Sequence, residues 1–144
     1  MRVLIIGGTG IIGSCLQKSL AKNAHEIVIT SRKSSTRDDS ALLLNLENIS
    51  ESAQTIRNAG KFDAVVLSAG VSSIRACRVN PDATSLVNVD AQVAIARELT
   101  SLNSPKIVLI SSNRVFDGST ELTKIMSAYS PTTEYGRQKS QAET

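Results

Sequence analysis

Tyr135 and Lys139 are two side chains whose spacing suits proton transfer. They lie four residues apart in a segment of helical character, so both would point to one side of a helix. A tyrosine hydroxyl titrates near pH ~10, but a neighbouring ammonium group favours the phenolate. The pair could therefore exchange a proton with a reacting oxygen. Taken alone the spacing is a weak signal, because such pairs also occur on ordinary helix surfaces.

Ser112 adds a hydroxyl group to this pair. It follows an apolar run at residues 107–110, and a serine at the end of a strand could hydrogen-bond the same substrate oxygen and orient a carbonyl for hydride delivery. The three residues are a stronger signal together than apart, because they follow a glycine loop along the chain in the order Ser112, Tyr135 and Lys139. We predict these three as the catalytic residues.

The glycine loop GGTGIIG follows the first apolar run and precedes a helical pattern. Gly7, Gly10 and Gly13 each have a physical use in such a loop: one permits the tight turn, one lets the backbone approach a pyrophosphate, and one lets the helix pack closely on the strand. Free amides at the start of the helix then favour phosphates. The alternative is a turn that is glycine-rich for steric reasons only, but its place between strand and helix favours dinucleotide binding.

The residues after the second apolar run indicate which dinucleotide this is. A carboxylate at this position would bind the ribose of NAD, whereas this chain has Thr30, Ser31, Arg32 and Lys33. Two cations and no carboxylate suit a 2′-phosphate, with Arg32 as its bidentate partner. We predict NADP(H), with NAD(H) as the alternative; Arg32 and Lys33 would in that case be part of a solvated loop.

Apolar periodicity predicts the elements that must position these residues. Strands are expected at residues 3–6, 27–30, 41–44, 64–67 and 107–110, and helices at 11–22, 50–58, 81–102 and from about 131. Pro81 and Pro131 would occupy the first turns of their helices. The strands are apolar on both faces, as in a covered parallel sheet. We predict an α/β fold, a Rossmann-type doubly wound sheet in one domain over residues 1–144, with function beyond the carboxyl ends of the strands.

Composition limits the classes of function. No apolar run approaches the ~20 residues of a membrane-spanning helix, and the start does not resemble a signal peptide, so we expect a cytoplasmic protein with no membrane partner. The net charge is only +3 and there are two Phe, two Tyr and no Trp, which argues against nucleic-acid binding. Cys15 and Cys77 are expected as reduced, packed thiols, His25 as a turn residue, and no metal site is predicted.

With these motifs in place, the chain resembles the extended short-chain dehydrogenase/reductases, the NAD(P)-dependent epimerase/dehydratase family. The resemblance covers essentially the whole chain and rests on GGTGIIG, Leu67-Ser-Ala-Gly70, Val87-Asn88-Val, and Ser111-Ser112 with Tyr135-Gly-x-x-Lys139 and Glu143. Val115-Phe-Asp-Gly118 followed by Pro131 and Tyr135-Gly136 is most similar to the dehydrorhamnose reductases, which reduce a keto-sugar attached to a nucleotide.

The resemblance implies roles for particular residues. Ser112 would orient the substrate oxygen, Tyr135 would exchange its proton, and Lys139 would lower the tyrosine pKa and bind the nicotinamide ribose. Asn88 would support the site from the helix behind it. The cofactor-binding residues implied in all are Gly7, Thr9, Gly10, Ile11, Ile12, Gly13, Ser31, Arg32, Leu46, Ala69, Gly70, Asn88, Tyr135 and Lys139.

The function implied is NADP-dependent oxidation–reduction, or epimerisation or dehydration, of a nucleotide-linked sugar, with keto-sugar reduction favoured. The alternative is an NAD(P)-binding regulatory or sensor subunit without turnover. A homodimer formed through the long helix and the tyrosine helix is also possible in this family.

Three features depart from the reductase pattern. Asn113-Arg114 replaces the usual Asp-Tyr pair, and Asn45-Leu46 stands where relatives commonly carry an acidic residue near adenine. Family members also continue well beyond the tyrosine helix. We therefore expect this chain to be an amino-terminal portion that lacks the last strand and the substrate lobe, and to be inactive on a sugar by itself.

Overall fold

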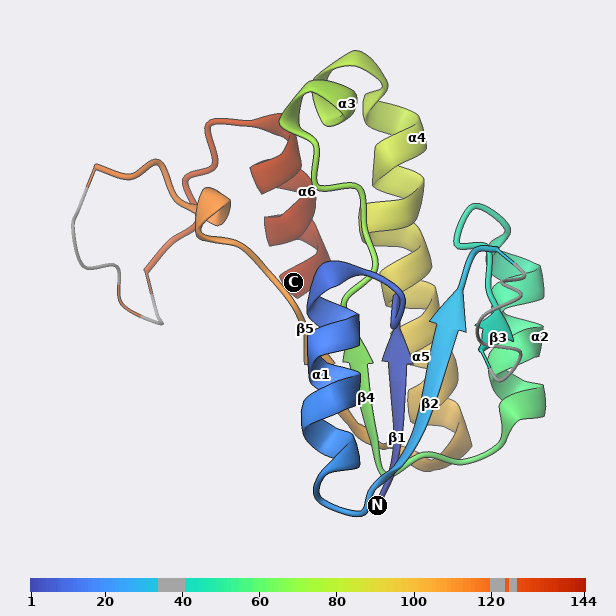
Figure 1. The fold of residues 1–144 in the computed structure, drawn as a ribbon. Coiled ribbons are helices and arrows are strands. Elements are labelled where there is room, and N and C mark those ends of the chain that lie inside the picture. Colours follow the sequence, from blue (N-terminus) through green and yellow to red (C-terminus); the bar gives the residue numbers. More distant parts are fainter. Residues whose placement is uncertain (34–40, 120–123, 125–126) are drawn as a thin grey trace.

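The computed structural model describes residues 1–144 except 34–40, 120–123 and 125–126. Five parallel strands form one sheet in the order β3-β2-β1-β4-β5 (Figure 1). The strands are β1 Arg2–Ile6, β2 Glu26–Ser31, β3 Leu42–Leu43, β4 Ala64–Leu67 and β5 Lys106–Leu109. The predicted Rossmann-type sheet is confirmed. The third strand is shorter than expected, because β3 is at the edge of the sheet and pairs only with Thr30 and Ser31.

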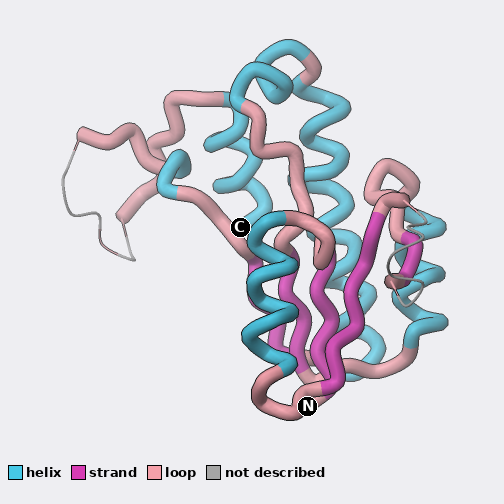
Figure 2. The backbone as a smooth tube through the Cα atoms, viewed as in Figure 1, coloured by secondary structure: helices cyan, strands magenta, loops and turns pink. Residues whose placement is uncertain are grey.

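Helices connect the strands (Figure 2). They are α1 Ile11–Ala21, α2 Ile49–Ala59, α3 Ile74–Val79, α4 Pro81–Ser85, α5 Ala91–Asn103 and α6 Glu134–Glu143, with a π-helical turn η1 Leu86–Asp90 and a 3-10 turn η2 Asn113–Val115. The helix predicted at 81–102 is found as the continuous run of α4, η1 and α5. The short elements α3 and η2 were not predicted, because neither is long enough to show a helical period.

The prediction that Pro131 occupies the first turn of the last helix is wrong. That helix begins at Glu134, and Thr133 caps it by accepting a hydrogen bond from the Gly136 N–H at 3.1 Å. Pro81, in contrast, does lie in the first turn of α4. The prediction of packed thiols holds only for Cys77, which is buried; Cys15 lies on α1 and is exposed.

The two faces of the sheet pack against different helices. Along β1, Leu4 and Ile6 belong to the larger apolar cluster with residues of α2 and α5, while Val3 and Ile5 pack on the other face with side chains of α1. This alternation follows from the period of two in a strand. Figure 1 shows α1 on one side of the sheet and α5 on the other. Burial on both faces explains why the strands read as continuous apolar runs.

The turn between β1 and α1 leaves almost no room for side chains. Gly7 has φ +85°, a conformation that favours glycine, and a Cβ on Gly13 would come within 2.2 Å of the Gly7 carbonyl oxygen. A Cβ on Gly8, which sequence analysis did not single out, would come within 2.4 Å of the Ile29 side chain. The glycines at 7 and 13 therefore serve the turn and the helix–strand packing.

We expect Gly13→Ala to lower the free energy of unfolding by about 1–3 kcal/mol, because the new methyl group meets backbone atoms that cannot move aside. The matched control is Ser19→Ala, an exposed position of the same helix, where alanine should be neutral or slightly stabilising. Urea denaturation of both variants measures the difference. Equal stability of Gly13→Ala and the wild-type protein would contradict this steric account.

Candidate functional site

A cleft of about 490 Å³ opens beyond the carboxyl ends of β1, β2 and β4. The order of the strands reverses between β1 and β4, and parallel sheets bind ligands at such a switch point. Predicted cofactor residues that line the cleft are Gly7, Thr9, Gly10, Ser31, Arg32, Leu46, Ala69 and Gly70. The other lining residues are Ile6, Thr30, Lys33, Leu44, Ser68, Val71 and Val87.

The start of α1 can receive a phosphate group. Gly10 caps this helix with no side-chain hydrogen bond, and the first turn contains no acidic residue. A Cβ on Gly10 would meet only the Gly7 carbonyl oxygen, at 3.3 Å, so a ligand can approach the backbone there. Unpaired N–H groups and the helix dipole favour an anion at this end. The arrangement fits the pyrophosphate of a dinucleotide.

Ile11, Ile12 and Gly13 do not line the cleft, although sequence analysis assigned them to the cofactor. Ile11 is 88% exposed and Ile12 is 48% exposed, while Gly13 is buried against the backbone of Gly7 and Gly8. All three lie in the first turn of α1, whose backbone N–H groups can bind an anion.

Two cations stand at the β2 side of the cleft. The Ser31 hydroxyl accepts a hydrogen bond from the Lys33 N–H at 3.2 Å and donates one to the Lys33 carbonyl at 2.9 Å. This short turn places Arg32 and Lys33 among the lining residues, and both are exposed. A phosphate on the adenosine ribose would be neutralised here by a bidentate guanidinium contact.

Thr30 connects the β2 side of the cleft to the glycine loop. Its hydroxyl accepts a hydrogen bond from the Gly7 N–H at 3.0 Å, and the residue is buried. Thr30 was not predicted to be a site residue. Its position at the end of the second apolar run was the available signal, since strand ends surround the cleft.

Asn88 lies behind the wall of the cleft and does not line it. The residue is 2% exposed; its Oδ1 accepts a hydrogen bond from the Val71 N–H at 2.7 Å and its Nδ2 donates to the Val71 carbonyl at 3.0 Å. A Cβ on Gly70 would come within 2.9 Å of Asn88 Oδ1. Asn88 therefore supports the loop after β4 from behind, and its side chain does not line the cleft.

The three predicted catalytic residues are not among the residues that line the cleft. Helix α6, which carries Tyr135 and Lys139, packs against α3, η1 and η2 beyond the carboxyl ends of the strands (Figure 1). Ser112 caps η2 by accepting a hydrogen bond from the Arg114 N–H at 3.2 Å. A Cβ on Gly136 would lie 2.0 Å from the Arg114 carbonyl oxygen, so the absence of a side chain there lets α6 approach η2.

Burial and a neighbouring carboxylate shift the pKa of Lys139 in opposite directions. The residue is only 6% exposed, and burial lowers its pKa, while the nearby Glu143 carboxylate acts in the opposite direction. Glu143 also accepts hydrogen bonds from the hydroxyl groups of Ser111 and Tyr129, the latter at 2.8 Å. The hydrogen bond to Glu143 raises the pKa of Tyr129. Glu143 thus joins the end of β5 to the helix that carries Lys139.

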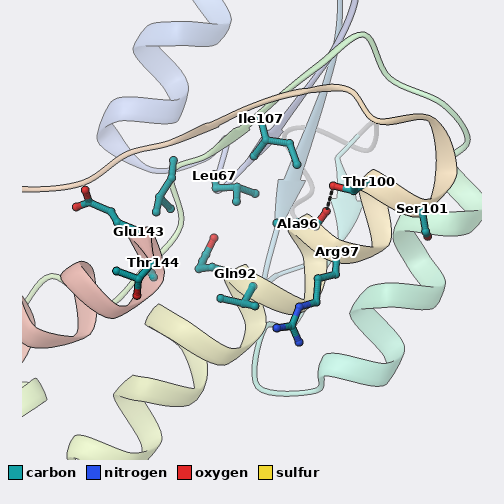
Figure 3. A pocket seen from close by; sticks show the side chains of 12 residues that line it. Leu67, Gln92, Ala96, Arg97, Thr100, Ser101, Ile107, Glu143 and Thr144 are labelled. Carbon is teal, nitrogen blue, oxygen red and sulfur yellow. Dashed lines mark hydrogen bonds between the residues drawn. The ribbon is translucent and has the colours of Figure 1, made fainter.

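A second groove, of about 590 Å³, lies between β5, α5 and the end of α6 (Figure 3). Leu67, Ile107 and Leu109 line it together with Gln92, whose buried Oε1 has no hydrogen-bond partner among the described residues. It shares no lining residue with the first cleft and contains none of the glycines of the loop. The smaller cleft is therefore the better candidate for a dinucleotide.

The described residues contain neither a cluster of metal-binding side chains nor a helix able to span a membrane. Across residues 1–33, 41–119, 124 and 127–144, no three His, Cys, Asp or Glu side chains gather as a metal site requires. Within the same residues, every helix is too short or too polar to cross a bilayer.

Comparison with curated proteins finds two relatives. The UDP-glucose 4-epimerase of Neisseria meningitidis serogroup C is 27% identical in an alignment that covers 99% of this chain and 46% of the epimerase. The methionine adenosyltransferase 2 subunit beta of Bos taurus is 28% identical over 143 residues, which cover 99% of this chain and 41% of that protein. This chain therefore spans less than half the length of either relative.

Solved structures show the same fold. A hypothetical dTDP-4-dehydrorhamnose reductase from Sulfolobus tokodaii superposes with a TM-score of 0.87 and 26% identity, over 99% of this chain and 50% of the reductase. Residues 3–144 match the family described as the NAD dependent epimerase/dehydratase family. Because that match includes the glycine loop, the strand ends and the α6 helix together, the chain belongs to the NAD-dependent epimerase/dehydratase family.

Proposed function

We propose that this chain is the NADP(H)-binding half of an oxidoreductase of the short-chain dehydrogenase type that acts on a nucleotide-linked sugar, with keto-sugar reduction favoured over epimerisation. The observation that carries the proposal is the cleft between β1 and β4, with the open start of α1 at one side and Arg32 at another. The similarity to a UDP-glucose 4-epimerase and to a hypothetical dTDP-4-dehydrorhamnose reductase supports a nucleotide-linked sugar as substrate.

Ser112, which caps η2, and two residues of α6, Tyr135 and Lys139, would perform the acid–base part of the reaction. A bound NADP(H) would supply or accept the hydride. Ser112 would hydrogen-bond the substrate oxygen, and Tyr135 would give its hydroxyl proton to that oxygen during reduction or take it back during oxidation. Lys139, four residues further along α6, would stabilise the phenolate and hold ribose hydroxyl groups. Burial of the Lys139 side chain strengthens its electrostatic effect on its neighbours.

We propose further that substrate contacts belong to the part of the relatives that these 144 residues do not match. The chain spans 46% of the epimerase and 50% of the reductase. These residues alone should therefore bind the cofactor but not turn over a sugar. Cofactor binding can be measured on this chain, whereas turnover is to be measured on a protein that also contains such a substrate-binding part.

Removing the Arg32 side chain should weaken NADPH binding about tenfold or more and leave NADH affinity unchanged, since a charge-assisted hydrogen bond contributes about 1.5–3 kcal/mol. Fluorescence titration of wild type and Arg32→Ala with both cofactors measures this. Arg78→Ala, an exposed arginine on α3 outside the cleft, is the matched control. Wild-type affinity for NADH equal to or above that for NADPH would contradict the role given to Arg32.

In the full-length protein, Tyr135→Phe should lower kcat by about 10²–10⁴, the contribution of a positioned acid–base group. NADPH affinity should change little, because the substitution keeps the ring in its half-buried place on α6. Tyr129→Phe is the control, since Tyr129 bonds Glu143 and lies outside the predicted catalytic set. Unchanged turnover in Tyr135→Phe would remove the basis for an acid–base role.

A second candidate is a cofactor-binding regulatory subunit. The 28% identity to a protein named methionine adenosyltransferase 2 subunit beta favours it, and so does Asn113-Arg114 in place of an acidic and aromatic pair. The intact Ser112, Tyr135 and Lys139 set argues against it, because a sensor needs no proton donor. Tight NADP binding without cofactor oxidation over a panel of nucleotide-linked keto-sugars, together with a stable complex with an enzyme, would favour this candidate.

A further inference from the structure

Gln138 is a fully buried amide in the middle of α6. It is 0% exposed and lies between Tyr135 and Lys139 in the sequence. Its Nε2, which has two N–H groups, lies within hydrogen-bond distance of three acceptors: Thr84 Oγ1 at 2.9 Å, Glu134 Oε1 at 2.9 Å and the Pro81 carbonyl at 3.1 Å. Burying an amide is costly unless its polar atoms find partners, so this site is built around the glutamine side chain.

The remaining hydrogen bond of Gln138 leads toward the cofactor cleft. Its Oε1 accepts a hydrogen bond from Asn88 Nδ2 at 2.8 Å. Asn88 in turn binds both the N–H and the carbonyl of Val71, and Val71 lines the cleft. A continuous chain of hydrogen bonds therefore runs from the cleft wall, through Asn88, to the helix that carries Tyr135 and Lys139.

The backbone around Asn88 is unusual in a way that serves this connection. Asn88 lies in the π-helical turn η1, between α4 and α5. Such turns are rare and widen the helix by one residue, and they occur frequently at functional sites. Asn88 is the one residue of η1 that is buried, and its amide satisfies Val71 and Gln138 together.

Contacts on two sides of α6 fix its position. On one side Gly136 allows close approach to the Arg114 carbonyl oxygen, and on the other the buried amide of Gln138 is held by α4 and η1. A helix with a fixed buried amide cannot rotate or slide without breaking several hydrogen bonds at once. The same contacts fix the backbone positions of Tyr135 and Lys139, because both are within three residues of Gln138 on one helix.

We propose that Gln138 is a positioning residue that, through Asn88, couples the Val71 wall of the cofactor cleft to the Tyr135 and Lys139 side chains of α6. The proposal rests on the proposed function, because it assumes that α6 faces the nicotinamide half of NADP(H). Loosening Gln138 should disturb that half of the cofactor site and leave the adenosine half, formed by the glycine loop and Arg32, as it is.

The test compares a ligand that reaches both halves with one that reaches only the adenosine half. NADPH and adenosine 2′,5′-bisphosphate are titrated by calorimetry into the wild-type chain, Gln138→Met and the control Gln141→Met. Methionine keeps the length of the side chain and removes its hydrogen bonds, and Gln141 is an exposed glutamine of the same helix. Gln138→Met should lose NADPH affinity about tenfold, keep bisphosphate affinity within twofold, and differ from Gln141→Met, which should match wild type.

Equal effects on the two ligands, or no effect on either, would overturn the coupling while wild-type NADPH binding still upheld the proposed function. Failure of the wild-type chain to bind NADPH would overturn both. If Gln138→Met does not fold, Thr84→Val removes one acceptor of the Gln138 amide and keeps the shape of the side chain. A selective loss of about threefold for NADPH is then expected, and the absence of a selective loss overturns the coupling.

Discussion

The turn after β1 passes so close to the end of β4 that a Cβ on Gly7 would lie 2.8 Å from the Ala69 N and Cα atoms. This contact is possible because β1 and β4 are hydrogen-bonded neighbours, although more than fifty residues separate them in the sequence. Helix α1 leaves toward one face of the sheet, and the chain after β4 continues toward the other. The candidate cofactor cleft is the space that these two diverging connections leave open.

The structure supports this cleft with buried polar groups on both sides. Thr30 holds the Gly7 N–H from β2, and Asn88 holds Val71 from the π-helical turn. These bonds satisfy backbone groups that a tight turn or a loop would otherwise leave unpaired. Different residues therefore support the β2 side of the cleft and the side formed by the loop after β4.

The fold could be predicted from the sequence because its strongest signals are local. Apolar runs predicted the positions of all five strands, and the spacing of the glycines predicted the turn after β1 that forms one side of the cleft. What escaped prediction depends on contacts between distant residues or on short elements. The Asn88 and Gln138 pair joins positions 50 residues apart, and a π-helical turn has no pattern of its own. The start of the last helix was predicted at Pro131, but Thr133 caps the helix instead. Cys15 was predicted to be packed, because the sequence of its helix did not show that this position faces solvent.

We infer that a dinucleotide binds in the cleft between β1 and β4 and not in the groove beside β5. Amide chemical-shift mapping of the ¹⁵N-labelled chain during NADPH titration distinguishes the two sites. The largest shifts are expected at Gly7 to Gly13, at Arg32 and Lys33, and at Ala69 to Val71. Shifts concentrated instead on Gln92, Ala96 and Ile107 would place the ligand in the second groove and overturn this inference.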